Sequence, residues 1–224
     1  ISRSTDFYEP SNFDKVSGAI VVITDDAGVK DTLAEDEPGL YLTNILEGQQ
    51  GVTYNLFVRI DDQEYQAVTT MPGKIHLDSI SYEYLSTPHG SGQMVFCHFN
   101  DEKKVDNYLR IKTYLKNNLE GNRITVFDDK LFKDGNAKLP VIQGPDNLFE
   151  SGDSLKIELL SISYDTYLYY KTLSKEIVGE ETGMMQGTIH GKTAPANPVT
   201  NISGGALGYF TACCISSKEV VLED

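Results

Sequence analysis

The sequence predicts an all-β protein made of two antiparallel β-sandwich domains, of which the second carries one short helix and a long Gly-rich crossover loop. Three observations predict this fold class. Short runs of alternating apolar and polar residues recur along the chain. Turn-forming Gly, Pro, Asn and Asp residues separate these runs, as they do in antiparallel sheets. A single segment has the spacing of apolar residues that a helix requires.

The first strands of the chain are expected to form a small sandwich. A β-branched run at 19–24 stops at the turn-rich Asp25–Gly28. Val52–Ile60 alternates between two faces, and Tyr65–Thr70 returns as the second strand of a hairpin. Four strands are therefore expected here, at residues 19–24, 39–42, 52–60 and 65–70.

A break in the strand pattern predicts a domain boundary near residue 74. Met71-Pro72-Gly73 interrupts the alternation, because proline cannot donate a hydrogen bond to a ladder and glycine loosens the chain. The predicted domains are a small sandwich at residues 1–74 and a larger sandwich at residues 75–224. Alternation within the larger domain predicts strands at residues 75–84, 93–99, 108–115, 123–127 and 155–159.

The larger domain is expected to contain one helix at residues 163–178. Ser163 can cap the free amides of a helix that starts at Tyr164, and Gly179 can end it. The tyrosines of this segment occupy too much of the helix circumference for all of them to be buried. At least one is expected to reach solvent or a neighbouring loop, from the set Tyr164, Tyr167, Tyr169 and Tyr170.

The segment from Gly179 to Gly205 has no sustained periodicity over its 27 residues, whereas typical connections run about 4–6 residues. The favoured interpretation is structural. In it, this loop crosses the sandwich and delivers residues 206–212 as a closing strand, with glycines that allow close backbone passage. The alternative is a loop that contacts a ligand.

Composition excludes several classes of function. The formal net charge is −14, from 33 acidic and 19 basic residues. Such a surface repels phosphate backbones and anionic lipid headgroups, so the sequence predicts no nucleic-acid partner and no electrostatic membrane binding. No apolar run approaches the roughly 18 residues that a membrane span needs. The acidity is interpreted as a solubility feature, with a preference for cationic ligands or Ca²⁺ as the alternative.

Three cysteines form no metal-ligand pattern. Cys213 and Cys214 are neighbours and would point to opposite faces of a strand. Buried free thiols are the favoured interpretation, and a single bridge from Cys97 to Cys213 or Cys214 is the alternative in an oxidising compartment.

The sequence predicts no catalytic residues, no metal site and no cofactor. The four histidines, His76, His89, His98 and His190, lie in predicted strands or Gly-rich loops without a catalytic setting. The densest group of oxygen ligands contains Asp128, Asp129 and Asp134, but its spacing differs from that of an EF-hand, and a capped turn is favoured over a calcium site. No phosphate-binding glycine loop is found. Tyrosine, present 13 times, can stack on sugars or peptides, although core packing accounts for most of these residues.

Several motifs are spread along most of the chain. They are Gly51-x-x-Tyr54-x-Leu56, Met71-Pro72, Asp78-x-Ile80, Asn107-Tyr108-x-Arg110, Asp128-Asp129-x-x-Phe132-x-Asp134-Gly135, Gly152-Asp153 and the closing run from Asn197-Pro198 to Tyr209-Phe210. Together they resemble a family of outer-membrane-associated lipoproteins of Gram-negative bacteria, domain of unknown function 4249. The first domain also resembles the transthyretin-like or carboxypeptidase-regulatory-like sandwich, in which a tyrosine fills the core. Neither resemblance supplies catalytic residues.

The resemblance implies a lipid-anchored protein of the cell envelope, at the outer membrane and either periplasmic or surface-exposed. It implies an N-terminal lipid anchor ahead of these residues as the only membrane contact. It also implies an accessory role beside a TonB-dependent outer-membrane receptor in nutrient uptake, with the receptor and a small nutrient as partners. A non-catalytic binding protein is therefore the leading hypothesis. A structural or adhesive spacer is the second hypothesis, and an envelope hydrolase with paired carboxylates is the third.

Overall fold

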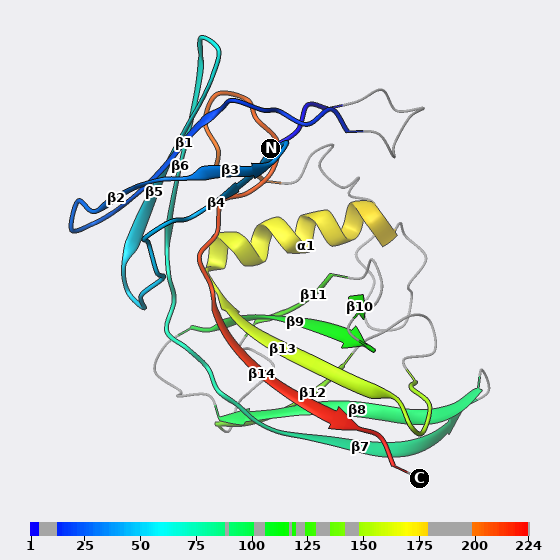
Figure 1. Cartoon of the computed structure of the whole chain (residues 1–224). Helices are drawn as coiled ribbons and strands as arrows, with labels where there is room; N and C mark the ends of the chain where they lie inside the picture. The colour runs from blue at the N-terminus through cyan, green and yellow to red at the C-terminus, as the bar shows by residue number, and fades with distance from the viewer. Residues whose placement is uncertain are drawn as a thin grey trace, which may run out of the picture. The chain divides into compact units, whose positions relative to one another are not determined.

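The computed structural model describes residues 1–4, 13–87, 90–100, 106–116, 118–119, 124–128, 135–141, 148–178 and 199–223. The chain forms two compact units. The first unit contains Ile1–Met71 and Thr200–Ala212, and the second contains Pro72–Val199 and Cys213–Asp224. Most of the described elements are antiparallel strands, which confirms the predicted all-β class (Figure 1).

The first unit contains a four-stranded antiparallel sheet in the order β2-β1-β5-β6 and a ribbon of β3 and β4. Its strands are β1 (Ile20–Asp25), β2 (Lys30–Thr32), β3 (Ala34–Glu37), β4 (Leu40–Leu42), β5 (Thr53–Ile60) and β6 (Gln63–Thr70). Tyr54 of β5 is buried, and its hydroxyl oxygen accepts a hydrogen bond from the Gln49 amide at 2.7 Å. Tyr54 therefore lies in the core, three residues after Gly51, whose φ of 79° is one that glycine adopts without strain.

The segment Thr200–Ala212 belongs to the first unit, where it lies along the edge strand β6. Asn201 donates from Nδ2 to the carbonyl oxygens of Val68 (3.1 Å) and Phe210 (2.8 Å), and its Oδ1 accepts from the Phe210 amide. The Ser203 amide donates to the Gln66 carbonyl at 2.8 Å, and the Gln66 amide donates to Ser203 Oγ. This segment therefore pairs with part of an otherwise open sheet edge.

The expected closing strand at residues 206–212 is wrong. No strand forms there. Gly208 within the segment has a φ of 113°, and Gly204 and Gly205 just before it also have positive φ, a conformation that interrupts extended pairing. The last strand is β14 (Cys214–Val221), which the sequence analysis did not predict. Most of the long loop, residues 179–198, lies outside the described residues.

The second unit is a sandwich of two antiparallel sheets, in the orders β12-β8-β7 and β10-β9-β13-β14, with β11 also paired to β9. Its strands are β7 (Leu77–Thr87), β8 (Gly90–Asn100), β9 (Tyr108–Leu115), β10 (Asn118–Leu119), β11 (Thr125–Asp128), β12 (Asn136–Pro140), β13 (Ser154–Ile162) and β14. Alternate residues of both sheets meet in one core, which includes Val95, Cys97, Phe99, Leu109, Ile111, Leu139, Leu155, Ile157 and Leu159.

Helix α1 (Tyr164–Val178) follows β13 directly. The amide of Thr166 donates to Ser163 Oγ at 3.2 Å, which confirms Ser163 as the N-cap. The helix packs on β9 and β11, where Tyr167 joins a small apolar cluster with Leu160 and Ile162 of β13. The tyrosine expectation is also confirmed, because Tyr164 is 52% exposed.

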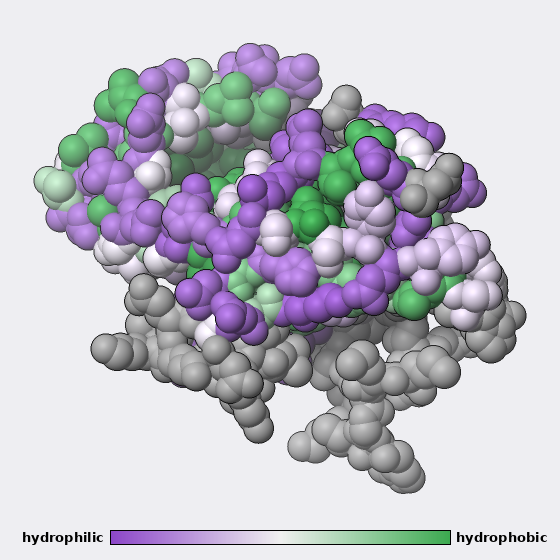
Figure 2. Space-filling view, turned by 90° about the horizontal axis from the view of Figure 1, so that it is seen from below, coloured by the Kyte–Doolittle hydropathy of each residue, from purple (hydrophilic) through white to green (hydrophobic). Residues whose placement is uncertain are grey.

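Among the described residues, no helix is long and apolar enough to cross a membrane. The face drawn in Figure 2 is mainly hydrophilic, with smaller hydrophobic patches between the polar side chains. Single exposed apolar residues are normal on folded proteins. Those of this chain include Ile45, Leu207, Val68 and Leu119.

Candidate binding surface

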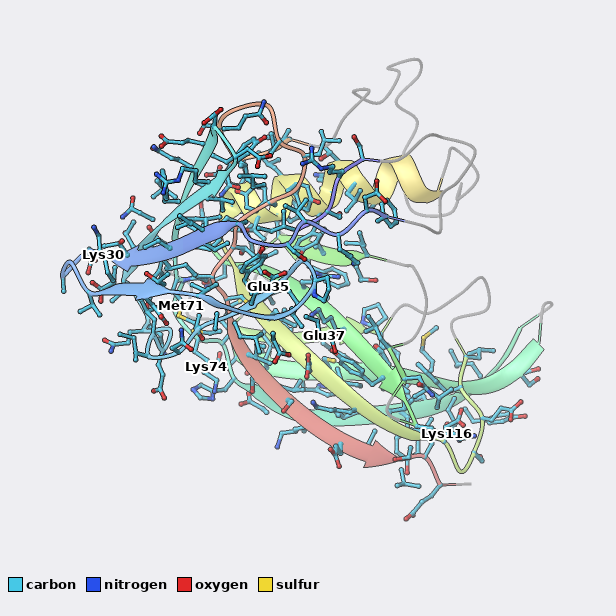
Figure 3. All side chains as sticks on the ribbon, turned by 45° about the horizontal axis from the view of Figure 1, so that its top comes forward. Lys30, Glu35, Glu37, Met71, Lys74 and Lys116 are labelled. Carbon is cyan, nitrogen blue, oxygen red and sulfur yellow. The ribbon has the colours of Figure 1, made fainter. Side chains whose placement is uncertain are left out.

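The larger sheet of the second unit has one face in the core and one outer face. On β9, Leu109 and Ile111 are buried in the core, and the residues between them point the other way. The register places Tyr114 opposite Lys156 of β13 and Lys112 opposite Glu158. We call this set the outer β9 face: Tyr108, Arg110, Lys112 and Tyr114 of β9 with Lys156 and Glu158 of β13. β9 runs from the start of α1 toward Lys116 (Figure 3).

Three tyrosine rings cluster where α1 covers one end of the outer β9 face. The Tyr108 ring centroid lies 5.1 Å from that of Tyr164 and 5.2 Å from that of Tyr167. Tyr167 is buried, whereas half of Tyr164 is exposed. The cluster therefore anchors the helix and leaves one amphipathic ring at the surface, where a ligand can reach it.

A short polar chain ties the cluster to β11. Lys171 Nζ donates to the Tyr167 hydroxyl at 3.0 Å, and that hydroxyl donates to Asp128 Oδ2 at 3.3 Å. The hydrogen bond to Tyr167 raises the pKa of Lys171 above its usual value, although partial burial opposes the shift. Lys171 therefore stays charged at neutral pH, and its positive charge offsets the negative charge of Asp128.

Arg110 stands next along β9. Its guanidinium carbon lies 4.0 Å from the ring centroid of Tyr170, within cation–π range. Its Nε is buried and has no hydrogen-bond partner, an uncommon state for a donor of this kind. Arg110 and Lys112 form no ion pair with any residue that the structure describes.

The far end of the outer β9 face holds a charged pair. Lys156 Nζ lies 2.8 Å from Glu158 Oε1, and the Tyr114 hydroxyl donates to Glu158 Oε2 at 3.1 Å. Burial raises the pKa of Glu158, but the hydrogen bonds from Lys156 and Tyr114 outweigh it and hold this pKa below its usual value. Glu158 is thus ionised at neutral pH and neutralises Lys156.

The structure places two of the four histidines; His89 and His190 lie outside the described residues. His98 Nε2 and Ser81 Oγ are 2.7 Å apart on neighbouring strands β7 and β8. Within the described parts of the chain no carboxylate, the group that orients the imidazole of a catalytic triad, hydrogen-bonds to His98. This pair is a feature that the sequence analysis did not detect, because its two members are 17 residues apart.

The suggested calcium ligands are only partly described, since Asp129 and Asp134 lie outside the described residues. Asp128 accepts a hydrogen bond from the Tyr167 hydroxyl. Where side chains are described, no group of three or more His, Cys, Asp or Glu residues is arranged to hold a metal ion.

All three cysteines are free thiols. Cys97 lies in the core of the second unit, fully buried, and this burial raises its pKa to about 12. Cys214 is also buried, and its Sγ lies 3.4 Å from the Pro72 carbonyl oxygen. Cys213 lies on the outer side and is partly exposed, with its pKa also raised by burial.

We expect iodoacetamide at pH 8 to alkylate Cys213 first and to leave Cys97 unmodified while the protein is folded. The reason is that thiolates are the reactive form and Cys97 has neither access nor thiolate character. Peptide mass spectrometry over time would measure both rates. Addition of urea provides the control, because unfolding should bring the two rates close together. Rapid labelling of Cys97 in the folded chain would contradict the buried core position.

The fold and this surface define a class of protein: an all-β protein with a sandwich whose outer sheet face carries aromatic and cationic side chains. Residues 1–219 match the family described as Domain of unknown function (DUF4249), and the chain belongs to this family. No curated protein and no solved structure matches the chain significantly. The likeness to transthyretin-like sandwiches therefore stays a prediction.

Proposed function

We propose that this protein is a non-catalytic binding protein of the bacterial cell envelope. In this proposal it is held at the outer membrane by an N-terminal lipid anchor and works beside a TonB-dependent receptor in nutrient uptake. The envelope context follows from what the resemblance of its motifs implies. The ligand-contacting part is the outer β9 face with the tyrosines of α1.

One observation supports a binding role more than any other. Arg110 and Lys112 stand together on a sheet face without an ion pair to a described residue, although the chain carries 33 acidic residues. A fold with so many carboxylates can readily neutralise two cations. Cations beside tyrosine rings that have no ion-pair partner among the described residues are typical of recognition surfaces.

Co-purification tests the proposal. The full-length lipoprotein, tagged at its C-terminus, would be extracted with mild detergent from its own envelope, and partners would be identified by mass spectrometry. We expect a TonB-dependent receptor to be enriched relative to a tagged, unrelated lipoprotein of similar charge. Recovery of the protein as a free monomer would count against the proposal.

Ligand binding separates this function from a structural or adhesive spacer. A spacer should show no saturable binding of glycans or nutrients in solution. A binding protein should show saturation that depends on side chains of the outer β9 face.

A further inference from the structure

We propose that the outer β9 face binds a saccharide that carries a carboxylate, that is, an acidic sugar of the uronate type. This inference rests on the proposed binding function and adds the class of ligand. It is carried by the charges, the spacing and the aromatic neighbours of Arg110 and Lys112.

The charges of the outer β9 face favour an anion. Lys156 and Glu158 form an ion pair at 2.8 Å and therefore offset each other. Glu219 of β14 stands opposite Lys156 in the register, on the side away from β9. Arg110 and Lys112 form no described ion pair, although the Glu158 carboxylate stands opposite Lys112 in the register and interacts with its charge at longer range.

Spacing allows the two cations to act on one acidic group. Arg110 and Lys112 are two residues apart on one strand and point to the same face, so their Cα atoms are about 6–7 Å apart. Both long side chains can converge on a carboxylate over that distance. The Tyr170 ring lies against the Arg110 guanidinium and limits its rotation, which lowers the entropy lost when it binds.

The aromatic neighbours favour a sugar ring. The half-exposed Tyr164 lies beside Tyr108 at one end of this face. At the other end Tyr114 stands two residues beyond Lys112, with Lys156 Nζ 5.4 Å from its ring centroid and its hydroxyl bonded to Glu158. A tyrosine presents a flat apolar ring for stacking and a hydroxyl for hydrogen bonds. A sugar ring that carries hydroxyl groups and a carboxylate can stack on the tyrosine ring and hydrogen-bond to the tyrosine hydroxyl.

An acidic peptide fits this face less well. Peptides that add a strand need a free sheet edge. β9 is paired with β13 on one side and with β10 and β11 on the other, so its backbone offers no free edge along most of its length. Binding of an acidic peptide is therefore one of the outcomes that the test distinguishes.

The test compares trigalacturonate with its fully methyl-esterified form, which keeps the sugar rings and removes the negative charges. Isothermal titration calorimetry with the whole chain would be run at low salt and at 0.15 M salt. We expect the acid to bind about tenfold or more tighter than the ester, and we expect salt to weaken the binding of the acid.

Lys112→Gln is the main variant, because the Lys112 side chain makes no described hydrogen bond that the fold would lose. We expect it to weaken binding of trigalacturonate about tenfold. Arg110→Lys is the second variant; it keeps the charge, loses the planar fork and should weaken binding by a smaller factor. Lys30→Gln, at the start of β2 (Figure 3), is the matched control and should leave binding unchanged. Equal melting temperatures would show that each variant is folded.

Equal affinities for acid and ester, or unchanged binding of the acid by Lys112→Gln, would overturn the inference. So would an acidic peptide that binds with the same dependence on Lys112 while trigalacturonate does not bind. In each of these cases co-purification with a receptor could still succeed. Failure of the ligand class is thereby distinguished from failure of the proposed function.

Discussion

Replacing Leu159 with alanine is expected to lower the free energy of unfolding by about 2–5 kcal/mol. Leu159 is fully buried at the centre of β13 and packs in the sandwich core with Leu155 and Ile157. The substitution removes apolar contacts and leaves a cavity that the two facing sheets cannot close completely. A urea titration followed by far-UV circular dichroism would measure the loss.

Leu119→Ala is the matched control for this prediction. It makes the same chemical change at a residue of the same unit that is 54% exposed. A surface change of this kind is expected to stay within about 0.5 kcal/mol. Equal losses for the two variants would mean that Leu159 does not lie in a closely packed core.

The strands with regular alternation could be predicted from the sequence. β5, β9 and β13 have apolar residues at every second position because one face of each lies in a core. The α1 helix could be predicted because a capping serine precedes the tyrosines. In these segments the local pattern and the tertiary packing agree.

The remaining strands have weak local signals. β14 has mainly exposed, mixed side chains, because it is an edge strand that packs only on one side. Its pairing with β13 depends on contacts with residues far away in the sequence. β3 is acidic and exposed throughout, so no alternation marks it.

The candidate site was only partly predictable. The tyrosines of the helix and an aromatic contact surface followed from composition. The contact between Arg110 and Tyr170 could not be predicted, because the two residues are 60 positions apart and nothing in either segment indicates it. Asn201 is similar: its side chain fixes a loop against β6 through Val68, which is 133 residues away.

Asp31 is expected to be the acidic residue whose replacement destabilises the first unit most. It is 2% exposed, and its Oδ2 accepts hydrogen bonds from three consecutive backbone amides. Those amides belong to Asn44 (2.9 Å), Ile45 (3.0 Å) and Leu46 (3.0 Å). The carboxylate thereby fixes the chain that follows β4 against β2, and without it these donors lose a charged acceptor.

Acid should remove the contribution of Asp31. The hydrogen bond from the Ile45 amide, with those from Leu46 and Asn44, outweighs burial and holds the pKa of Asp31 below its usual value. A lowered pKa in the folded state means that the ionised carboxylate stabilises the fold above the unfolded value of about 3.9. This stabilisation is lost as the pH falls through the lower, folded value.

The variant Asp31→Asn separates charge from shape, because its amide keeps an acceptor oxygen and loses the titratable group. We expect its melting temperature to lie well below that of the unsubstituted protein at pH 7, and the difference to shrink as the pH falls below 4. Asp62→Asn, at an exposed turn position of the same unit, should have little effect at either pH. Differential scanning calorimetry at pH 7 and pH 3 would give both differences. An equal deficit for Asp31→Asn at the two pH values would show that the three amides are not held by the charge.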